Sequence, residues 1–229
     1  MIRLFVSHPL SEKEVIRLSE SQTHYLLHVM RRQVGDTVSL FNGRDGEWTA
    51  VIQELTKKES RLSLTQKKRN QSPTEQIILC PALIKKEPMD FVFQKATELG
   101  VSDIYPLITE RTVVSKLNME RTQNLLIEAA EQCERLTVPT LHEPVKLSDL
   151  WQTLPQTVQP ICLAERGEKQ TPDFSGKIYA FCIGPEGGWS PNELALFEHH
   201  KTPFWHLGDT ILRAETAAIV SVACYRFNR

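Results

Sequence analysis

The sequence predicts an α/β domain with a parallel sheet, preceded by a small, mostly antiparallel β-barrel. Two successive strand, loop and helix units occupy roughly the last fifty residues, and this repeat is typical of a parallel sheet. Strand and helix patterns alternate over the longer stretch of residues 76–227, which favours the same fold class. The N-terminal part differs, because its short strand-like runs after residue 36 follow one another with only turn residues between them.

The N-terminal part is expected to form the barrel. Its strand-like runs are residues 2–6, 37–41, 46–55 and 61–66. Residues 42–46, Asn-Gly-Arg-Asp-Gly, have the composition of a hairpin turn. Between the first two strands, residues 21–32 predict a short helix with Thr23 as its N-cap and Gly35 beyond its end.

A polar, cationic stretch closed by proline, residues 67–74, predicts a linker. It divides the chain into domains at residues 1–72 and 73–229. Residues 1–73 contain 12 Lys and Arg against 8 Asp and Glu, whereas residues 74–229 contain 15 against 20. A basic module is therefore joined to an acidic one, and a nucleic-acid partner would bind the basic one by neutralising phosphates.

The second domain begins with a buried-strand pattern and then alternates. A first helix is stopped by Gly100 and is expected to bury Phe91, Phe93, Ala96 and Leu99. The predicted order is strand 76–83, helix 89–99, strand 101–108, helix 118–135, short helix 148–154 and strand 158–164.

The last two units carry glycine-bearing loops. Strand 177–183 leads into loop 183–189, after which Ser190, Pro191 and Glu193 form the start signal of a helix. Strand 204–207 leads into loop 207–217 and a helix over residues 214–227. Ligands of parallel sheets bind at the carboxyl ends of strands, so both loops are candidate ligand loops, although the glycines can equally be turn residues only. Neither loop has the pattern of a phosphate-binding loop.

The bulk composition favours a globular cytoplasmic protein. No run of 18 apolar residues occurs, and the first apolar run is too short for a signal peptide. The five cysteines show no C-x-x-C spacing, and Cys80, Cys162 and Cys182 lie in apolar strand-like runs, so core positions are expected for these three. The seven histidines form no H-E-x-x-H motif, and no metal site is indicated.

Four motifs together resemble one known family. They are residues 94–101, Gln-Lys-Ala-Thr-Glu-Leu-Gly-Val; residues 128–135, Glu-Ala-Ala-Glu-Gln-Cys-Glu-Arg; residues 183–188, Ile-Gly-Pro-Glu-Gly-Gly; and residues 207–217. In this order they resemble the RsmE family of small-subunit ribosomal RNA (uracil-N3)-methyltransferases, which belongs to the SPOUT superfamily. Residues 24–32 with Gly35 and Asp36 resemble the PUA-like RNA-binding domain of that family. The chain departs from the family at residues 86–88, Lys-Glu-Pro, where members often have a glycine-containing basic turn.

The resemblance implies a C-terminal domain with a deep trefoil knot that holds S-adenosylmethionine in a bent shape. Segments 163–167, 183–188 and 207–217 would line its pocket. Small residues suit close approach of a ligand to the backbone, and leucines suit the walls of an adenine site. The implied cofactor-binding residues are Leu163, Gly184, Pro185, Gly187, Gly188, Leu207, Gly208, Ile211, Leu212 and Ala217.

The resemblance also implies a reaction and its partners. The methyl group would go to N3 of a specific uridine in small-subunit (16S) ribosomal RNA, as free RNA or as the 30S subunit, and the enzyme would be a homodimer. Uracil N3 must lose a proton, so a cation that stabilises the anionic ring and a proton acceptor are needed. Arg213 is the first candidate for the cation and Arg111 the second. Glu186 or Glu215 would accept the proton, or would instead orient an arginine or a backbone amide.

The uracil N3 atom lies on the Watson–Crick edge, so the target must be unpaired or flipped out. The candidate RNA contacts of the N-terminal domain are Arg3, His24, Arg31 and Arg32. For the helix that carries the last three, the alternative is a solvated end with cations well placed at its C-terminus.

Three other functions stay open on the residues alone. The first is an RNA-binding ribosome-assembly factor without catalysis, which the intact loops 184–188 and 207–217 disfavour. The second is a SPOUT enzyme that methylates another base or a ribose. The third is a nucleotide-dependent α/β enzyme, which the missing phosphate signatures disfavour.

Overall fold

The computed structural model describes residues 1–73, 75–114, 116–165, 172, 174 and 176–228. Its contacts divide the chain into two compact units, residues 1–74 with 130–138 and residues 75–129 with 139–229. Each unit has its own hydrophobic core. Residues 130–138 fall in the second domain in the sequence-based division, yet they make their contacts with the first unit.

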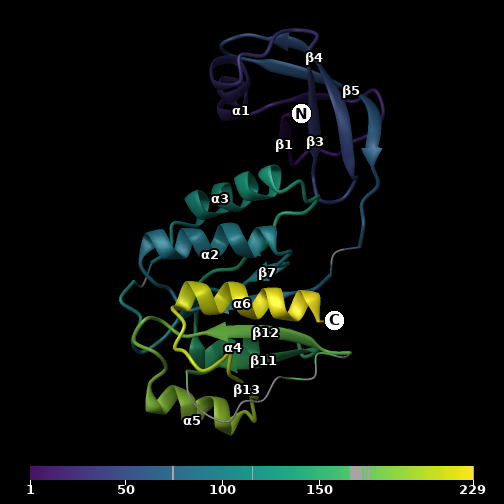
Figure 1. Ribbon diagram of the computed structural model, residues 1–229. Coiled ribbons are helices and arrows are strands. Elements are labelled where there is room, and N and C mark those ends of the chain that lie inside the picture. Colours follow the sequence, from purple (N-terminus) through teal and green to yellow (C-terminus); the bar gives the residue numbers. More distant parts are fainter. Residues whose placement is uncertain (74, 115, 166–171, 173, 175, 229) are drawn as a thin grey trace. The chain divides into compact units, whose positions relative to one another are not determined.

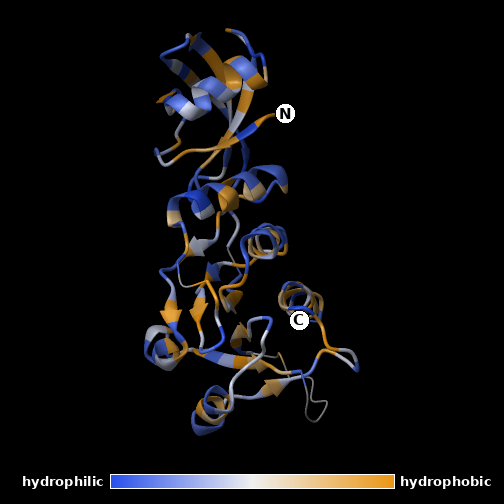
Figure 2. Ribbon diagram, turned by 90° about the vertical axis from the view of Figure 1, so that its left-hand side faces the viewer, coloured by the Kyte–Doolittle hydropathy of each residue, from blue (hydrophilic) through white to orange (hydrophobic). Residues whose placement is uncertain are grey.

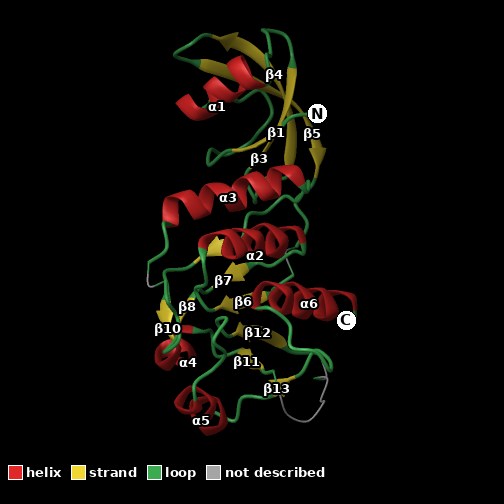
Figure 3. Cartoon of the chain, turned by 60° about the vertical axis from the view of Figure 1, so that its left-hand side comes forward, coloured by secondary structure: helices red, strands yellow, loops and turns green. Residues whose placement is uncertain are grey.

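The first unit is a curled five-stranded sheet in the order β1-β3-β4-β5-β2 (Figure 3). Strands β1 and β3 are parallel and the other neighbours are antiparallel. Four strands match the predicted runs, and β2 was not predicted because only Ile16 of its three residues is buried. The elements are β1 (Arg3–Phe5), β2 (Val15–Arg17), α1 (Glu20–His24), the π-helix η1 (Tyr25–Val29), β3 (Thr37–Phe41), β4 (Glu47–Leu55) and β5 (Ser60–Arg69).

Helix α1 begins one turn earlier than predicted. Its N-cap is Ser19, whose hydroxyl accepts a hydrogen bond from the Gln22 amide at 3.2 Å, while the Gln22 side chain accepts from the Ser19 amide at 3.3 Å. This reciprocal capping box satisfies two backbone amides, so the chain has no need of a cap at Thr23. The prediction of Thr23 as the cap was wrong: its hydroxyl is buried and shares a hydrogen bond with that of Ser60 at 2.7 Å.

Strand β5 runs three residues beyond its predicted end and takes in Lys67, Lys68 and Arg69, which were expected in the linker. The reason is a buried carboxylate on the neighbouring strand. Glu47 is fully buried and accepts hydrogen bonds from Arg69 Nε at 2.6 Å and from Lys68 Nζ at 3.2 Å. The cationic stretch therefore compensates a buried charge in the sheet.

Arg3 belongs to the same cluster, and its prediction as an RNA contact is corrected here. Its guanidinium lies 3.3 Å from Glu47 Oε1 and donates to the backbone oxygens of Ala130, Glu131 and Arg135 at 3.0–3.1 Å. The Arg3 side chain is only 3% exposed, so its donors face protein acceptors instead of a ligand. A cation in a basic module can either bind RNA or neutralise a buried carboxylate, and the sequence alone does not distinguish these two roles.

Replacing Glu47 by glutamine is expected to lower the free energy of unfolding by about 3 kcal/mol, because it leaves the buried Arg3 guanidinium without its counter-charge. Burial raises the pKa of the Glu47 carboxyl, but hydrogen bonds from Ser39 and Arg69 and the charge of Arg3 outweigh it and bring the pKa to about 2. The folded pKa is thus below the unfolded one. The stabilisation is complete above about pH 4.5 and is lost as the pH falls towards 2.

Urea unfolding at pH 7 and at pH 3 measures this effect. The difference between wild type and Glu47→Gln is expected to be smaller at pH 3. Glu59→Gln serves as the control, since Glu59 pairs with Arg61 at the surface and its loss is expected to change stability much less. Equal stability of wild type and Glu47→Gln at pH 7 would contradict the prediction.

The second unit contains a six-stranded parallel sheet in the order β13-β11-β12-β6-β7-β9, which confirms the predicted parallel sheet. Pro106 interrupts the strand predicted over residues 101–108 and leaves two short ones. The elements are β6 (Ile78–Pro81), α2 (Lys86–Glu98), β7 (Asp103–Ile104), β8 (Leu107–Ile108), α3 (Met119–Gln132), β9 (Thr140–Leu141), β10 (Val145–Lys146), the 3₁₀ helix η2 (Leu147–Asp149), α4 (Leu150–Thr153), β11 (Val158–Leu163), β12 (Ile178–Ile183), α5 (Pro191–His199), β13 (Phe204–Trp205) and α6 (Ala214–Phe227).

Helices cover both faces of this sheet (Figure 1). On one face, α4 and α5 pack through Leu150 and Phe197 against a core that includes Cys80, Cys162 and Cys182. On the other face α6 lies against β12 and β6. Apolar residues concentrate on the strands between these layers (Figure 2). The prediction that the three cysteines are core residues is confirmed, since all three are fully buried.

The helices of the second unit are found where they were predicted, although α2 begins three residues earlier, at Lys86, and α3 ends three residues earlier, at Gln132. Helix α6 has the predicted bounds, and α5 has the predicted cap, with Ser190 Oγ accepting from the Glu193 amide at 3.1 Å. In α2, Phe93 and Ala96 are buried as predicted, but Phe91 is 45% exposed. The helix buries Met89 and Val92 instead, because its start at Lys86 brings an earlier turn into the packed face.

Candidate functional site

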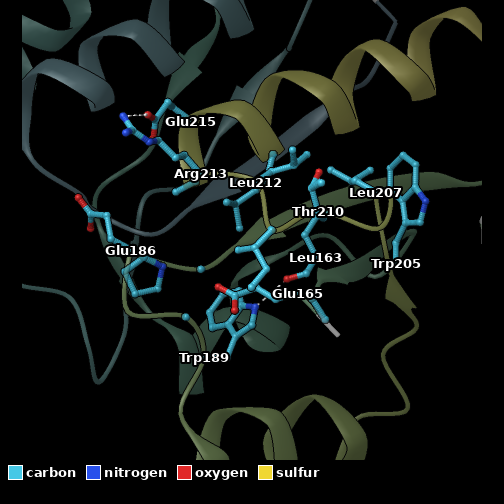
Figure 4. Close-up of a pocket in the computed structure, with 18 of the residues that line it drawn as sticks. Leu163, Glu165, Glu186, Trp189, Trp205, Leu207, Thr210, Leu212, Arg213 and Glu215 are labelled. Carbon is cyan, nitrogen blue, oxygen red and sulfur yellow. Dashed lines mark hydrogen bonds and ion pairs between the residues drawn. The ribbon is translucent and has the colours of Figure 1, made fainter. Parts of the chain in front are cut away.

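A pocket of about 400 Å³ lies at the carboxyl ends of β11, β12 and β13 (Figure 4). Three chain segments that are far apart in the sequence form it, together with one residue of α2. A pocket at this edge is the usual ligand site of a parallel sheet. Its lining residues are Pro88, Leu163, Ala164, Glu165, Ile183, Gly184, Pro185, Glu186, Gly188, Trp189, Trp205, Leu207, Gly208, Thr210, Ile211, Leu212, Arg213, Ala214, Glu215 and Ala217.

Trp189 fixes the floor of the pocket. Its indole Nε1 donates to the Leu163 carbonyl at 2.9 Å, and its ring packs edge-on against Phe197. A Cβ on Gly184 would lie 3.2 Å from the Trp189 ring. Gly184 is therefore needed for packing within the protein. The Trp189 ring that packs on it joins the end of β12 to the end of β11.

Gly188 and Gly208 have backbone conformations that favour glycine. Gly188 has a φ of +67°, donates its amide to the Pro185 carbonyl at 2.8 Å and closes a tight turn. A Cβ there would lie 3.4 Å from the Glu165 carboxylate. Gly208 has a φ of +141°, and a Cβ on it would meet nothing within 4 Å. Gly208 thus leaves open space beside the pocket wall.

Charged and apolar side chains separate along the pocket. In Figure 4, Glu186, Arg213 and Glu215 occupy one end, and Trp205 and Leu207 line the other. The Arg213 side chain is 87% exposed, and its Nη1 lies 4.0 Å from Glu215 Oε1. An exposed guanidinium at a pocket rim is free to approach a bound group. The apolar end suits a flat, uncharged ring system.

Arg111 lies next to the lining without being part of it. Its Nη1 donates to the Gly187 carbonyl at 2.6 Å, and a Cβ on Gly187 would lie 3.4 Å from the arginine's own side chain. Gly187 therefore makes room for Arg111, and it is the one predicted cofactor residue that does not line the pocket. The other predicted cofactor residues come together in the pocket, as do Arg213, Glu186 and Glu215.

Sequence reasoning missed the lining residues outside the three predicted segments, which are Pro88, Trp189 and Trp205. Trp189 directly follows the predicted loop glycines, so its position was a usable signal. Trp205 lies inside a predicted strand, where nothing in the sequence separates a wall residue from a core residue. Of the predicted segment 163–167, residues 166 and 167 lie outside the described residues.

None of the residues that the structure shows lining the pocket is a cysteine. Burial raises the pKa of the Cys80 and Cys162 thiols well above its ordinary value, which keeps them protonated and unreactive. Among the described residues, no group of three or more His, Cys, Asp and Glu side chains is arranged to hold a metal ion.

The first unit presents a second candidate surface, formed by the last residue of α1, by η1 and by the turn that follows it. His24 and His28 are exposed with ring centroids 4.7 Å apart, and Tyr25 is 38% exposed beside them. Arg31 is exposed at a φ of +49°, while Arg32 lies 3.8 Å from Asp36. Cations and exposed rings occur together here, as in surfaces that bind unpaired nucleic acid.

No helix within the described part of the chain is long and apolar enough to cross a membrane.

Two family models match the chain. One, described as an RNA methyltransferase domain, matches residues 70–226, and the other, described as an RNA methyltransferase PUA domain, matches residues 18–65. The first covers the whole pocket and the second covers η1.

Relatives match over nearly the full length. The chain is 34% identical to the ribosomal RNA small subunit methyltransferase E of Rickettsia conorii, over 98% of this chain and 94% of the relative. It is 32% identical to the protein of the same name from Synechocystis, over 96% of this chain and 76% of the relative.

Two solved structures are similar in fold over almost the whole chain. A putative methyltransferase from Legionella pneumophila in complex with the cofactor SAM has a TM-score of 0.91 at 31% identity, covering 99% of this chain and 97% of that one. A ribosomal RNA small subunit methyltransferase E from Neisseria gonorrhoeae bound to S-adenosyl methionine has a TM-score of 0.91 at 26% identity, covering 100% and 98%.

Proposed function

The chain belongs to the RNA methyltransferase family that includes the ribosomal RNA small subunit methyltransferase E proteins, and from this premise we propose that it methylates N3 of a uridine in small-subunit ribosomal RNA with S-adenosylmethionine as donor. One observation carries the proposal. The 400 Å³ pocket lies at the carboxyl ends of three parallel strands, in a fold similar over its whole length to two structures solved with that cofactor. The same similarity speaks against an assembly factor without catalysis.

The pocket fits the cofactor by its chemistry. Leu163, Leu207 and Leu212 supply apolar walls for a purine, and a volume of about 400 Å³ falls in the range of small-molecule sites. Gly208 leaves room for a ligand to approach the backbone, as the open space around its missing side chain indicates. Bound there, S-adenosylmethionine supplies an electrophilic methyl group on a positively charged sulfur.

The residues at the charged end would handle the acceptor. A uracil loses its N3 proton as the methyl group arrives, so negative charge develops on the ring and its two carbonyl oxygens. Arg213 is exposed at the pocket rim and is the group we assign to stabilise that charge. Arg111, held at Gly187, is a second cation beside the glycine-bearing loop that follows β12.

Two carboxylates at this end differ in their surroundings. Glu215 lies 4.0 Å from Arg213 Nη1, which suits a role in orienting that guanidinium. Glu186 is exposed at the turn before Gly187 and suits the role of proton acceptor. We propose these assignments, in which Glu215 would orient Arg213 and Glu186 would take the proton that leaves uracil N3.

The first unit would select the RNA, with His24, Arg31 and Arg32 as its contacts. Arg31→Glu is expected to weaken RNA binding about tenfold, since a phosphate contact becomes a repulsion. Affinity for S-adenosylmethionine is expected to stay unchanged, because Arg31 lies in a different compact unit from the pocket. Filter binding of a labelled ribosomal RNA fragment and calorimetry with the cofactor measure the two affinities.

Lys57→Glu provides the matched control, because it makes the same charge change at an exposed position in the turn between β4 and β5. An equal loss of RNA affinity in both variants would indicate a general charge effect and would contradict a specific contact at Arg31.

Membership of the family also leads us to propose a chain topology, an oligomeric state and a place of action. We propose a SPOUT fold in which the C-terminal chain passes through a trefoil knot, supported by the path of the chain from β13, at the edge beside β11, back to α6 against β12 and β6. We also propose a homodimer that acts in the cytoplasm on the 30S subunit or its RNA.

One experiment tests the proposed function. Protein and labelled S-adenosylmethionine are incubated with small ribosomal subunits that lack the modification, and the methyl groups are mapped by mass spectrometry. A single methylated uridine, with the methyl group on N3, is expected. Cofactor binding without label in RNA would rule out the enzyme, and label on another base or on a ribose would redirect the assignment.

A further inference from the structure

One buried carboxylate joins two loops at the edge of the pocket. The Arg111 loop comprises residues 109–112, and the glycine loop comprises residues 184–190. Glu193, in the first turn of α5, is 4% exposed and does not line the pocket. Its Oε1 accepts from the Glu110 amide at 2.8 Å, and its Oε2 accepts from the Ser190 amide at 2.8 Å.

Further contacts link the Arg111 loop to the glycine loop and to the first turn of α5. Arg111 Nη1 donates to the Gly187 carbonyl at 2.6 Å, and Asn192 Nδ2 donates to Glu110 Oε1 at 3.2 Å. Hydrogen bonds from Ser190 and Asn192 lower the pKa of the Glu110 carboxyl. The Arg111 loop is therefore held at two points. One is the backbone amide of Glu110, and the other is the guanidinium of Arg111.

The start of helix α5 explains only one of the two hydrogen bonds that the Glu193 carboxylate accepts from backbone amides. Acceptance from Ser190 is the second bond of a capping box and serves to start α5. Acceptance from Glu110 serves no helix, since it reaches a loop 83 residues earlier in the chain. One oxygen of this almost completely buried carboxylate thus holds the backbone of Glu110, the residue before Arg111.

We infer that Glu193 is a positioning residue that holds Arg111 against the glycine loop, where the guanidinium faces the RNA base. The inference rests on the proposed function for the role of Arg111. Glu193 acts through the Glu110 amide and touches neither cofactor nor base. Without that bond the Arg111 loop no longer has a fixed position relative to the pocket. A developing anion is stabilised only by a charge that is held in position, so the rate is expected to fall.

Glutamine at this position separates the two roles of Glu193. A carboxylate has acceptors only, whereas a glutamine amide has one acceptor and two donors. Glutamine is as good as glutamate in a capping box, so Glu193→Gln keeps the bond to Ser190. Its amide nitrogen then faces the Glu110 amide, donor against donor, and the bond to the Arg111 loop is lost.

The test compares wild type with Glu193→Gln and with Glu198→Gln, which removes the same charge from an exposed position of the same helix. Glu193→Gln is expected to lower kcat about tenfold, with the dissociation constant of S-adenosylmethionine changed less than about twofold. Amide hydrogen exchange at Glu110 is expected to be at least about tenfold faster, because its buried acceptor is lost. Glu198→Gln is expected to match wild type in all three measurements.

A double-mutant cycle distinguishes positioning from a general loss of structure. In an Arg111→Ala background, Glu193→Gln is expected to lower kcat less than about twofold further, because its effect passes through Arg111. A full tenfold loss in that background, or wild-type kcat in the single variant, overturns the inference. Unchanged exchange at Glu110 overturns it independently of activity. Failure of the wild type to methylate RNA would instead count against the proposed function, and the exchange measurement would still test the contact.

Discussion

Arg213→Ala is expected to lower kcat for RNA methylation about 100-fold, because a positioned charge donor aimed at a developing oxyanion is typically worth 10² to 10³ in rate. The side chain is 87% exposed and caps no helix, so the fold and the cofactor pocket are expected to stay intact. Affinity for S-adenosylmethionine is accordingly expected to change little. Single-turnover kinetics with saturating cofactor and RNA measure the loss in the chemical step.

Arg213→Lys is the matched variant for this prediction. Lysine keeps the charge but lacks the planar pair of donors, so it is expected to recover part of the lost rate. If Arg213→Ala raises the KM for RNA and leaves kcat unchanged, Arg213 contributes to ground-state binding alone, and the assignment of a charge-stabilising role is wrong.

Gly188→Val is expected to weaken S-adenosylmethionine binding about 30-fold. The φ of +67° costs a residue with a side chain roughly 1–2 kcal/mol. The added carbons would also push against Glu165 at the pocket wall, where a Cβ alone already lies 3.4 Å from the carboxylate oxygen. Calorimetry with the purified variant gives the dissociation constant directly.

Gly176→Val separates strain from obstruction. Gly176 has nearly the same φ, +68°, but a Cβ there meets nothing within 4 Å, and the residue does not line the pocket. It is expected to lose stability while keeping cofactor affinity. Equal losses of affinity in the two variants would mean that backbone strain, and not the pocket wall, accounts for the effect at Gly188.

Local signals were sufficient for most elements of the second unit. Ser190, Pro191 and Glu193 marked the start of α5 because a capping box acts within one turn, and such local chemistry is visible in the sequence. The run from Ala214 to Phe227 gave the bounds of α6 for the same reason. The order of strand, loop and helix then placed both glycine loops at one edge of a parallel sheet, where the pocket is found.

Long-range partners explain the predictions that failed. Arg3 appeared to be free for RNA, but its partners are Glu47 and backbone oxygens more than 120 residues away. Residues 67–69 were predicted to be part of a linker because the carboxylate that Lys68 and Arg69 contact lies on another strand. A buried counter-charge cannot be inferred from a cationic stretch alone.

The sequence by itself thus determined the fold class, most helices and strands, and the two loops that line the pocket, since hydrophobic periodicity and capping act over a few residues. Only the tertiary structure decided the roles of particular charged groups. It buried Arg3, left Arg213 exposed at the pocket rim, and gave Glu193 a second partner in the Arg111 loop. The physical reason is that the function of a charge depends on its burial and on its nearest partner, and both are set by segments distant in the chain.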